Sequence, residues 1–244
     1  MNQNKEVYLL GAGPGDVELL TLKAVKLLKR ADVVLYDALV NPKVLDFCKE
    51  EVVLENVGKR KNRHLKNQEE INEMLIKYAN KFSCVIRLKG GTPFVFGRGF
   101  EEVRALRGAG FTPVVYSGVS STTAVPESFM IPLVDRAYND AYRTITGHHM
   151  HVFEEIVDKY IARENLVIMM GIHNLEPIVQ YLLRIGFPPT LPIAILSKGT
   201  TDEAQHIRSS LSAIEEKEKS FFQDIRALTP AIIFVGKSIE MNQD

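Results

Sequence analysis

The chain has 244 residues, and its 30 Lys and Arg balance 30 Asp and Glu, so its formal net charge is zero. Hydrophobic residues make up 45% and charged residues 25%, a composition that is typical of a folded globular protein and argues against disorder. Neutrality argues against a nucleic-acid-binding protein, because such domains usually carry a basic excess that displaces counterions from phosphates. The length suits one large domain or two small ones.

Two cysteines, Cys48 and Cys84, are too few for a disulfide framework or a zinc cluster, and their apolar neighbours predict buried thiols. No metal site is expected. The polar first residues lead directly into a predicted strand, so we expect no signal peptide. No apolar run approaches the ~20 residues that span a bilayer, so we expect a cytoplasmic protein without a membrane partner.

Short β-branched runs alternate with amphipathic stretches through the first half of the chain. Asn67 can cap a helix, with Glu70 placed three residues later to complete a capping box. Such alternation predicts a mostly parallel sheet covered by helices on both faces. We expect strands at 7–10, 32–36, 51–54, 83–88 and 112–116, and helices at 22–30, 67–80 and 101–107.

A second set of alternating elements follows a hinge near Ser117-Gly118. We expect strands at 143–147, 166–170, 192–196 and 231–235, helices at 153–162 and 175–185, and a surface helix or loop at 211–228. The fold class is therefore α/β, with two α/β domains, 1–117 and 118–244, each built on a mostly parallel sheet flanked by helices.

A glycine-rich turn, Gly11-Ala-Gly-Pro-Gly-Asp16, directly follows the first predicted strand. Glycines at the carboxyl end of a parallel strand let the backbone approach a ligand closely. The spacing is not that of a dinucleotide-binding motif, because Asp16 stands where that motif needs Gly and Pro14 lacks an amide hydrogen. This disfavours an NAD-dependent enzyme. The alternative is a simple strand-to-helix turn.

A second loop, 90–99, follows the strand at 83–88 and contains four glycines. Arg87 precedes the loop and Arg98 lies within it, and a structural turn rarely needs so many glycines together with two arginines. The pattern favours a second ligand-facing loop.

Acidic and basic residues follow two further predicted strands. Asp37 ends one of them, and Lys59 follows Gly58, so the two could converge as a proton-transfer pair or form a surface ion pair. Basic residues crowd segment 59–66, which could bind carboxylates or phosphates or form a solvated face.

Together these motifs resemble the tetrapyrrole methylase family. The similarity runs from Val7 to Gly236 and includes Ser117-Gly-Val-Ser-Ser121, Met170-Gly171, Gly199-Thr200 and Thr229-Pro-Ala-Ile-Ile-Phe-Val-Gly236. The resemblance implies two α/β domains with S-adenosylmethionine in a cleft between them, and a homodimer. It also implies S-adenosylmethionine-dependent methylation of uroporphyrinogen III at C2 and C7, which gives precorrin-2 for siroheme and cobalamin and releases S-adenosylhomocysteine.

The resemblance assigns roles to individual residues. Asp37 matches the family's proposed proton acceptor, and Lys59 its proposed proton donor. The expected cofactor-binding residues are Pro14, Gly90, Gly91, Thr92, Val95, Ser120, Ser121, Met170, Gly199 and Ala231. The tetrapyrrole substrate carries many carboxylates, for which the candidate ligands are Arg60, Arg63, His64, Arg98 and Arg136.

Several positions depart from the family's pattern near the expected site. Phe100, Phe129 and Met130 add bulk, Asp135 adds a negative charge, and Thr92 removes one. The departures are Thr92 for Asp, Phe100 for Gly, Ser117 for Pro, Phe129-Met130 for Ala-Gly, and Asp135 for His. They leave two alternatives open. One is a diverged methylase that acts on another corrinoid precursor or acidic acceptor, and the other is a binding protein without catalysis.

Overall fold

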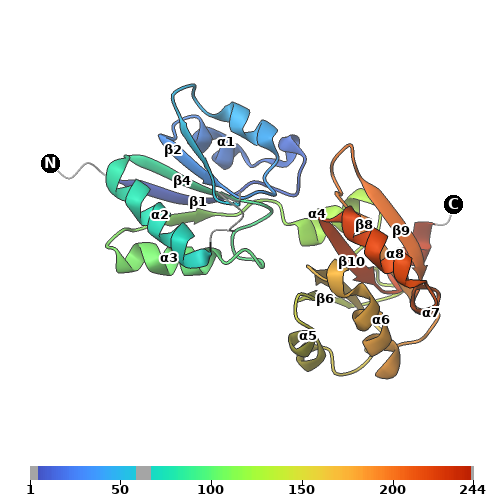
Figure 1. Cartoon of the computed structure of the whole chain (residues 1–244). Helices are drawn as coiled ribbons and strands as arrows, with labels where there is room; N and C mark the ends of the chain where they lie inside the picture. Colours follow the sequence, from blue (N-terminus) through green and yellow to red (C-terminus); the bar gives the residue numbers. More distant parts are fainter. Residues whose placement is uncertain (1–4, 59–66, 243–244) are drawn as a thin grey trace. The chain divides into compact units, whose positions relative to one another are not determined.

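The computed structural model describes residues 5–58 and 67–242 (Figure 1). The contacts between residues divide the chain into two compact units, Met1–Ser121 (unit 1) and Thr122–Asp244 (unit 2), which are described separately. The division after residue 117 that the sequence suggests falls in the loop just before this boundary.

The described part of unit 1 forms a five-stranded sheet in which every neighbouring pair of strands is parallel. The strands are β1 (Glu6–Gly11), β2 (Val33–Tyr36), β3 (Val53–Asn56), β4 (Cys84–Lys89) and β5 (Val114–Tyr116). Their order across the sheet is β3-β2-β4-β1-β5. The parallel sheet expected from the alternation of strands and helices is confirmed for this unit.

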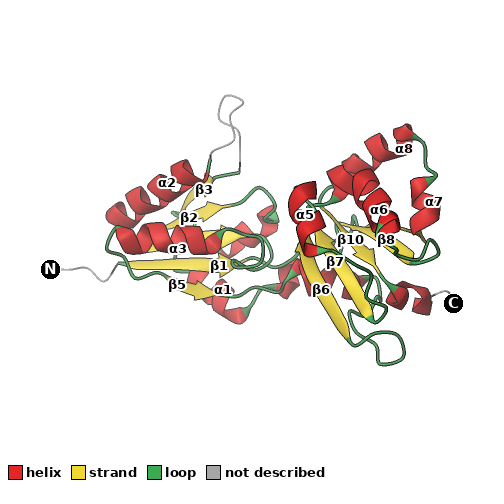
Figure 2. Ribbon diagram, turned by 90° about the horizontal axis from the view of Figure 1, so that it is seen from below, coloured by secondary structure: helices red, strands yellow, loops and turns green. Residues whose placement is uncertain are grey.

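Helices cover both faces of the unit 1 sheet (Figures 1 and 2). Side chains alternate along a strand, so Leu10 of β1 packs on the face covered by α1 (Leu22–Leu28), while Leu9 packs on the opposite face. That opposite face is covered by α2 (Gln68–Lys81) and α3 (Gly99–Gly108). The capping box predicted at the start of α2 is present.

In the described part of unit 2, the sheet also has five strands, in the order β6-β7-β10-β8-β9. They are β6 (Ala141–Thr146), β7 (Glu164–Met169), β8 (Pro192–Ser197), β9 (Gln205–Ser210) and β10 (Ala231–Val235). Of these pairs β6 and β7 are parallel, and the other pairs are antiparallel.

The expectation of a mostly parallel sheet is therefore wrong for unit 2. Segment 198–204 links β8 to β9 and is too short for the crossover that parallel neighbours require, so β9 returns antiparallel beside β8. The sequence also gave no sign of β9, because Gln205, His206, Arg208 and two serines form a polar strand at the edge of the sheet.

Two separate groups of helices cover the unit 2 sheet (Figure 2). On one face, α4 and the final turn Lys237–Asn242 contribute Val125 and Ile239 to a cluster with Phe234 of β10. The other face is covered by the remaining helices. The helices are α4 (Ser121–Ser128), α5 (Met150–Ile156), α6 (Leu175–Arg184), α7 (Leu211–Glu215) and α8 (Lys219–Asp224).

Two expectations for these helices are corrected. Segment 211–228 is not a surface segment, because it buries Leu211, Ile214, Phe222 and Ile225 in the core. The helix expected at 153–162 already ends at Ile156. The Tyr181 hydroxyl donates to the carbonyl oxygens of Glu154 (3.0 Å) and Val157 (2.8 Å), which satisfies groups that a longer helix would have bonded internally.

None of the helices formed by residues 5–58 and 67–242 combines the length and apolar character needed to cross a lipid bilayer.

We expect both thiols to react slowly in the folded protein. Cys84 is buried as predicted, whereas Cys48 is only half-buried. Burial, followed by the negative charge of Asp46, raises the pKa of Cys48 to about 11, and burial also raises the pKa of Cys84. Ellman's reagent at pH 7 should therefore label both thiols slowly in buffer and rapidly in urea. Rapid labelling of either thiol in the folded protein would contradict this.

Candidate active site

Three loops of unit 1 meet at the carboxyl ends of neighbouring parallel strands. β1 ends at Gly11, β4 leads to Gly91 and β5 leads to Gly118, and the order β4-β1-β5 makes these ends adjacent. The Gly91 N–H donates to the Gly13 carbonyl at 2.7 Å, and the Gly13 N–H donates back at 3.1 Å. A β-carbon on Gly11 would lie 2.5 Å from the Gly91 oxygen, so this approach requires glycine.

These loops carry most of the predicted cofactor residues of unit 1. Pro14 lies on the first loop, Gly90, Gly91 and Thr92 lie on the second, and Ser120 and Ser121 follow Gly118 on the third. Val95 lies further along the second loop and is 41% exposed. The glycines of these loops carry no side chains, which suits the close approach of a ligand to their backbone.

Gly118→Ala should lower the free energy of unfolding by about 2–3 kcal/mol, because the new β-carbon overlaps the Gly91 oxygen and lies 2.7 Å from the Gly11 carbonyl carbon. Urea denaturation measures the loss. Gly108→Ala is the control, since a β-carbon there meets nothing within 4 Å, and it should leave stability unchanged or slightly raised. An equal loss in both variants would contradict the steric argument.

The predicted cofactor residues of unit 2 also share one edge of a sheet. Met170 follows β7, Gly199 follows β8, and antiparallel β10 begins between them at Ala231, which pairs with Ser197. Met170, Lys198 and Thr200 have φ angles of 55°, 47° and 70°. Such backbone conformations are strained for residues other than glycine and concentrate at functional sites. These conformations occur at Met170 and on both sides of Gly199, which favours a ligand at this edge. The roles of Met170, Gly199 and Ala231 in cofactor binding stay predictions.

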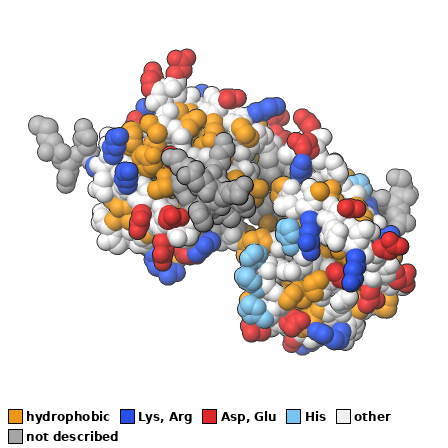
Figure 3. Space-filling view, viewed as in Figure 1, with side chains coloured by type: hydrophobic (Ala, Val, Ile, Leu, Met, Phe, Trp, Pro, Cys, Tyr) orange, Lys and Arg blue, Asp and Glu red, His pale blue; other side chains and the backbone are white. Residues whose placement is uncertain are grey.

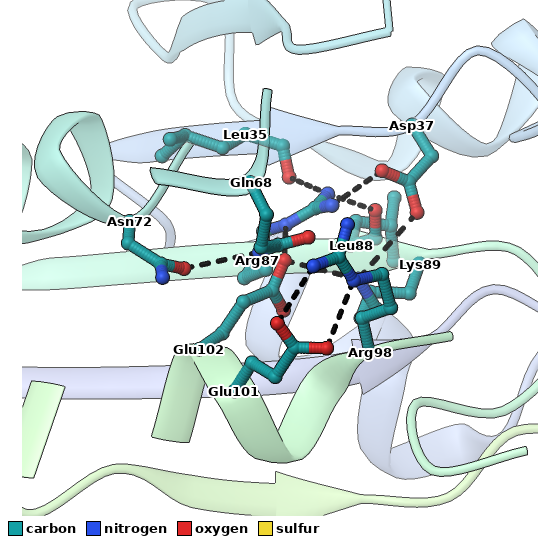
Figure 4. A network of polar contacts seen from close by, with 10 residues as sticks. All are labelled: Leu35, Asp37, Gln68, Asn72, Arg87, Leu88, Lys89, Arg98, Glu101 and Glu102. Atoms are coloured by element: carbon teal, nitrogen blue, oxygen red, sulfur yellow. Dashed lines mark hydrogen bonds and ion pairs between the residues drawn. The ribbon is translucent and has the colours of Figure 1, made fainter. Parts of the chain in front are cut away.

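Beneath Asp37 lies a network of buried charges that links β2, β4 and α3 (Figure 4). Arg87 donates from Nη2 to Asp37 Oδ1 and from Nε to Glu102 Oε1 (2.8 Å). Lys89 Nζ lies 3.0 Å from Glu102 Oε1 and 3.8 Å from Asp37 Oδ2. The side chains of Arg87, Lys89 and Glu102 are at most 3% exposed, whereas that of Asp37 is 31% exposed. Of these four side chains, Asp37 therefore presents the charge that solvent reaches.

The network follows from strand geometry. Arg87 and Lys89 are two residues apart on β4, so both point to the sheet face that α3 covers. The Tyr36–Leu88 register places Asp37 beside Lys89, and the Asp37 N–H donates to the Leu88 oxygen at 3.2 Å.

The two cations respond differently to burial. Burial acts to lower the pKa of Arg87, but the carboxylates of Glu102 and Asp37 outweigh it and hold that pKa above its ordinary value. Burial, followed by the positive charge of Arg87, lowers the pKa of Lys89 despite the same two carboxylates. The charged form of Lys89 therefore depends more on the two carboxylates than the charged form of Arg87 does.

The structure gives Asp37 partners that the sequence analysis did not assign. Lys59, its expected partner, lies outside the described residues, as do Arg60, Arg63 and His64. Arg87 and Lys89 stood in the sequence as parts of a glycine-loop motif, and Glu102 was not singled out. The signal that could have identified them is a pair of cations two residues apart within a strand that is otherwise apolar.

The two remaining candidate ligands for carboxylates are exposed. Arg98 starts α3 with a φ of 56°, and its guanidinium binds both carboxylate oxygens of Glu101 at 2.8 and 2.7 Å. Arg136 lies in unit 2, where its carbonyl oxygen accepts from Arg163 at 3.0 Å. Both guanidinium groups are accessible to solvent, as a ligand for substrate carboxylates must be.

The residues that depart from the family's pattern differ in their exposure and in their contacts. Phe100 is 49% exposed and meets Phe94 edge to face with centroids 5.9 Å apart, and Met130 is 73% exposed. Phe129, in contrast, packs against the unit 2 core. The Asp135 carboxylate accepts the Ala137 N–H at 2.8 Å, so its charge stabilises a local turn. Ser117 is exposed and Thr92 is half-buried, and nothing in the structure explains either departure.

Positive and negative side chains are interspersed over the visible face of each unit, in keeping with the zero net charge (Figure 3). Within residues 5–58 and 67–242, no group of three or more His, Cys, Asp and Glu side chains has a geometry that could hold a metal ion.

Comparison with known proteins adds three findings. The model of the tetrapyrrole (corrin/porphyrin) methylases matches residues 6–215. A uroporphyrinogen-III C-methyltransferase of Methanocaldococcus jannaschii is 41% identical over 239 residues, which cover 97% of each chain. A siroheme synthase of Acinetobacter baylyi is 40% identical over 240 residues, or 98% of this chain and 52% of that protein. The chain thus spans about half the length of the siroheme synthases that it matches.

Solved structures agree with these matches. The crystal structure of a Thermus thermophilus uroporphyrin-III C-methyltransferase in complex with S-adenosylhomocysteine superposes with a TM-score of 0.78 and 34% identity, and covers 96% of this chain and 98% of that one. A cobalt precorrin-4 methyltransferase has the same fold, with a TM-score of 0.81 and 19% identity over 96% of each chain. From the family match over residues 6–215 and the near-complete match to relatives at about 40% identity, the chain belongs to the tetrapyrrole methylase family.

Proposed function

We propose that the chain is an S-adenosylmethionine-dependent methyltransferase that methylates uroporphyrinogen III at C2 and C7 and so forms precorrin-2. The observation that carries this proposal is the 41% identity to the Methanocaldococcus jannaschii enzyme over 97% of both chains. The Thermus thermophilus enzyme, which was crystallised with S-adenosylhomocysteine, supports the same reaction and cofactor. The product would serve siroheme or cobalamin synthesis.

The residues present suit the cofactor. The glycines Gly11, Gly91 and Gly118 carry no side chains at the ends of their strands. In unit 2, residues with positive φ angles lie at Met170 and on both sides of Gly199. S-adenosylmethionine supplies an electrophilic methyl group. The chain has to hold the electron-rich pyrrole carbon in line with that methyl group and to exclude water.

Asp37 is proposed as the proton acceptor. Its side chain is 31% exposed, while Arg87 and Lys89 hold its two oxygens from the buried side. Methylation leaves a ring carbon that is fully substituted and carries no hydrogen, and it makes the ring system cationic. A proton must therefore leave another atom of the tetrapyrrole, and an anchored carboxylate can accept it as a general base. Lys59 is proposed as the proton donor, and the candidate ligands for the substrate carboxylates remain Arg60, Arg63, His64, Arg98 and Arg136.

The test is anaerobic incubation of the pure protein with uroporphyrinogen III and S-adenosylmethionine. We expect S-adenosylhomocysteine to accumulate and the tetrapyrrole to oxidise to a methylated, red-shifted chromophore. Calorimetry should be run in parallel with S-adenosylmethionine alone. Tight binding without turnover would contradict uroporphyrinogen III as substrate and favour a methylase with another acidic acceptor, whereas absence of binding would contradict the cofactor as well.

We also propose a cytoplasmic homodimer, as the resemblance to the family implies. Light scattering of the pure protein should then give twice the 27.5 kDa of one chain. A mass of one chain across the micromolar range would contradict the dimer and leave the proposed chemistry unaffected.

A further inference from the structure

A carboxylate that the proposed reaction does not use lies beneath Asp37. Glu102 of α3 has a fully buried side chain. Its Oε1 accepts from Arg87 Nε at 2.8 Å and from Lys89 Nζ at 3.0 Å, so one oxygen joins two cations (Figure 4). Its Oε2 is equally buried and has no hydrogen-bond partner within residues 5–58 and 67–242. Burial of a charge with an unsatisfied oxygen is unfavourable, which suggests a role beyond stability.

Charge balance shows what Glu102 provides. Arg87 and Lys89 are at most 3% exposed, and each contacts both carboxylates. With Glu102 the four side chains are neutral as a group. Without it, Asp37 would be the sole anion of the group facing two buried cations. Both cations contact the Asp37 carboxylate, and both also contact Glu102 Oε1.

We propose that Glu102 is a positioning residue for methyl transfer, because it joins Arg87 and Lys89 through one oxygen and keeps both where they hold the Asp37 carboxylate. The inference rests on the proposed function, in which Asp37 accepts a proton from the methylated ring. Glu102 itself does not reach solvent, so it acts through the two cations and not on the substrate.

Lys89 is the cation most sensitive to the loss of Glu102. The charged groups around Lys89 in the described structure include Arg87 on the same strand, Asp37 after β2, Glu102 and Glu101 on α3, and Arg98, which pairs with Glu101. Burial and Arg87 lower the pKa of Lys89, and the carboxylates of Glu102 and Asp37 oppose them. Removal of one carboxylate lowers that pKa further, so Lys89 loses its proton at a lower pH and releases its hold on Asp37.

The first arm of the test is Glu102→Gln, which keeps the shape and removes the charge. We expect kcat for methylation of uroporphyrinogen III to fall by about tenfold to a hundredfold, and the KM for S-adenosylmethionine to stay within about threefold. The basic limb of the pH profile of kcat should move to lower pH. Glu73→Gln, at an exposed position of α2, should change neither. An unchanged kcat and pH profile in Glu102→Gln would overturn the inference.

The second arm restores charge balance by a compensating change. In the Lys89→Met/Glu102→Gln variant, one cation and one anion are removed together, and the amide oxygen at position 102 can still accept from Arg87. Lys89 is the group whose loss of a proton shifts the basic limb, so we expect this variant to lack that shift. Its kcat should stay below that of the wild type, because Asp37 has lost one of its two cations. A double variant that kept the shifted basic limb would show that Lys89 does not cause the shift, and would overturn the argument.

The third arm is independent of activity. A lysine whose pKa in the folded protein lies below its ordinary value of 10.5 makes stability rise with pH between the two values. In Glu102→Gln this window should begin at a lower pH than in the wild type, with the unfolding constant in urea falling by up to about tenfold per pH unit within it. The double variant should lack the window.

These arms separate failure of the inference from failure of the proposed function. A wild-type protein that does not methylate uroporphyrinogen III contradicts the function, and the unfolding arm still tests the network. Glu102→Gln with the pH dependence of the wild type would then overturn the inference. Loss of cofactor binding together with stability in both variants would mean a purely structural role and would also overturn it.

Discussion

Asp37→Asn should lower kcat for methylation of uroporphyrinogen III by about 10²–10⁴-fold, the usual contribution of a general base. The amide keeps the shape of the side chain and can still accept from Arg87, but it cannot take up the proton released by the methylated ring. Binding of S-adenosylmethionine should be unchanged. Initial rates of S-adenosylhomocysteine formation measure the first quantity, and calorimetry the second.

Asp46→Asn is the matched control, because Asp46 is an exposed aspartate of the same unit and lies outside the network. It should retain the wild-type rate. If Asp37→Asn turned over within about threefold of the wild type, proton acceptance by Asp37 would be wrong, and the methyl transfer itself would need another base or water.

Arg87→Met should lower the free energy of unfolding by about 3–5 kcal/mol, the usual loss when one partner of a buried ion pair is removed. Glu102 would remain fully buried with Lys89 as its partner, and the Leu88 carbonyl would lose a donor at 3.1 Å. Urea denaturation at pH 7 measures the change.

Arg184→Met provides the comparison on the surface. Arg184 and Glu154 form an ion pair at 3.4 Å with side chains 69% and 42% exposed, so its loss should change stability little. A loss in Arg87→Met as small as that in Arg184→Met would show that the buried network does not stabilise the fold, and would weaken the argument that it holds Asp37 in place.

Local patterns in the sequence were enough to predict the parallel sheet of unit 1. Alternation of strands and helices predicted its parallel sheet, and Asn67 with Glu70 predicted the start of α2. The glycine loops that begin at Gly11 and Gly90 were also predicted, because each stands at the end of a predicted strand. These features depend on residues close together in the chain.

The sequence did not show which strands of unit 2 pair with one another. The insertion of β10 between β7 and β8 makes the unit 2 sheet mostly antiparallel, and no local pattern encodes which strands become neighbours. Segment 211–228 is rich in charge, which favoured the surface, although Leu211, Ile214, Phe222 and Ile225 reach the core. Polar β9 was missed because it lacks apolar alternation.

The candidate site shows the same limit. Asp37 was identified from its place at a strand end, but its contacts with Arg87 and Lys89 depend on the β2–β4 register, and those with Glu102 depend on the packing of α3. The sequence left open whether Lys59 forms a proton-transfer pair or a surface ion pair with Asp37, and Lys59 lies outside the described residues. Residues far apart in the sequence therefore form a network that only the three-dimensional structure displays.

The most direct test of the central claim uses S-adenosylmethionine with a deuterated methyl group. After anaerobic reaction with uroporphyrinogen III, mass spectrometry and NMR should find labelled methyl groups at C2 and C7 of the tetrapyrrole, with matching amounts of S-adenosylhomocysteine. A tetrapyrrole recovered without label, or labelled at other positions, would contradict the assignment of this chain as a methyltransferase that forms precorrin-2.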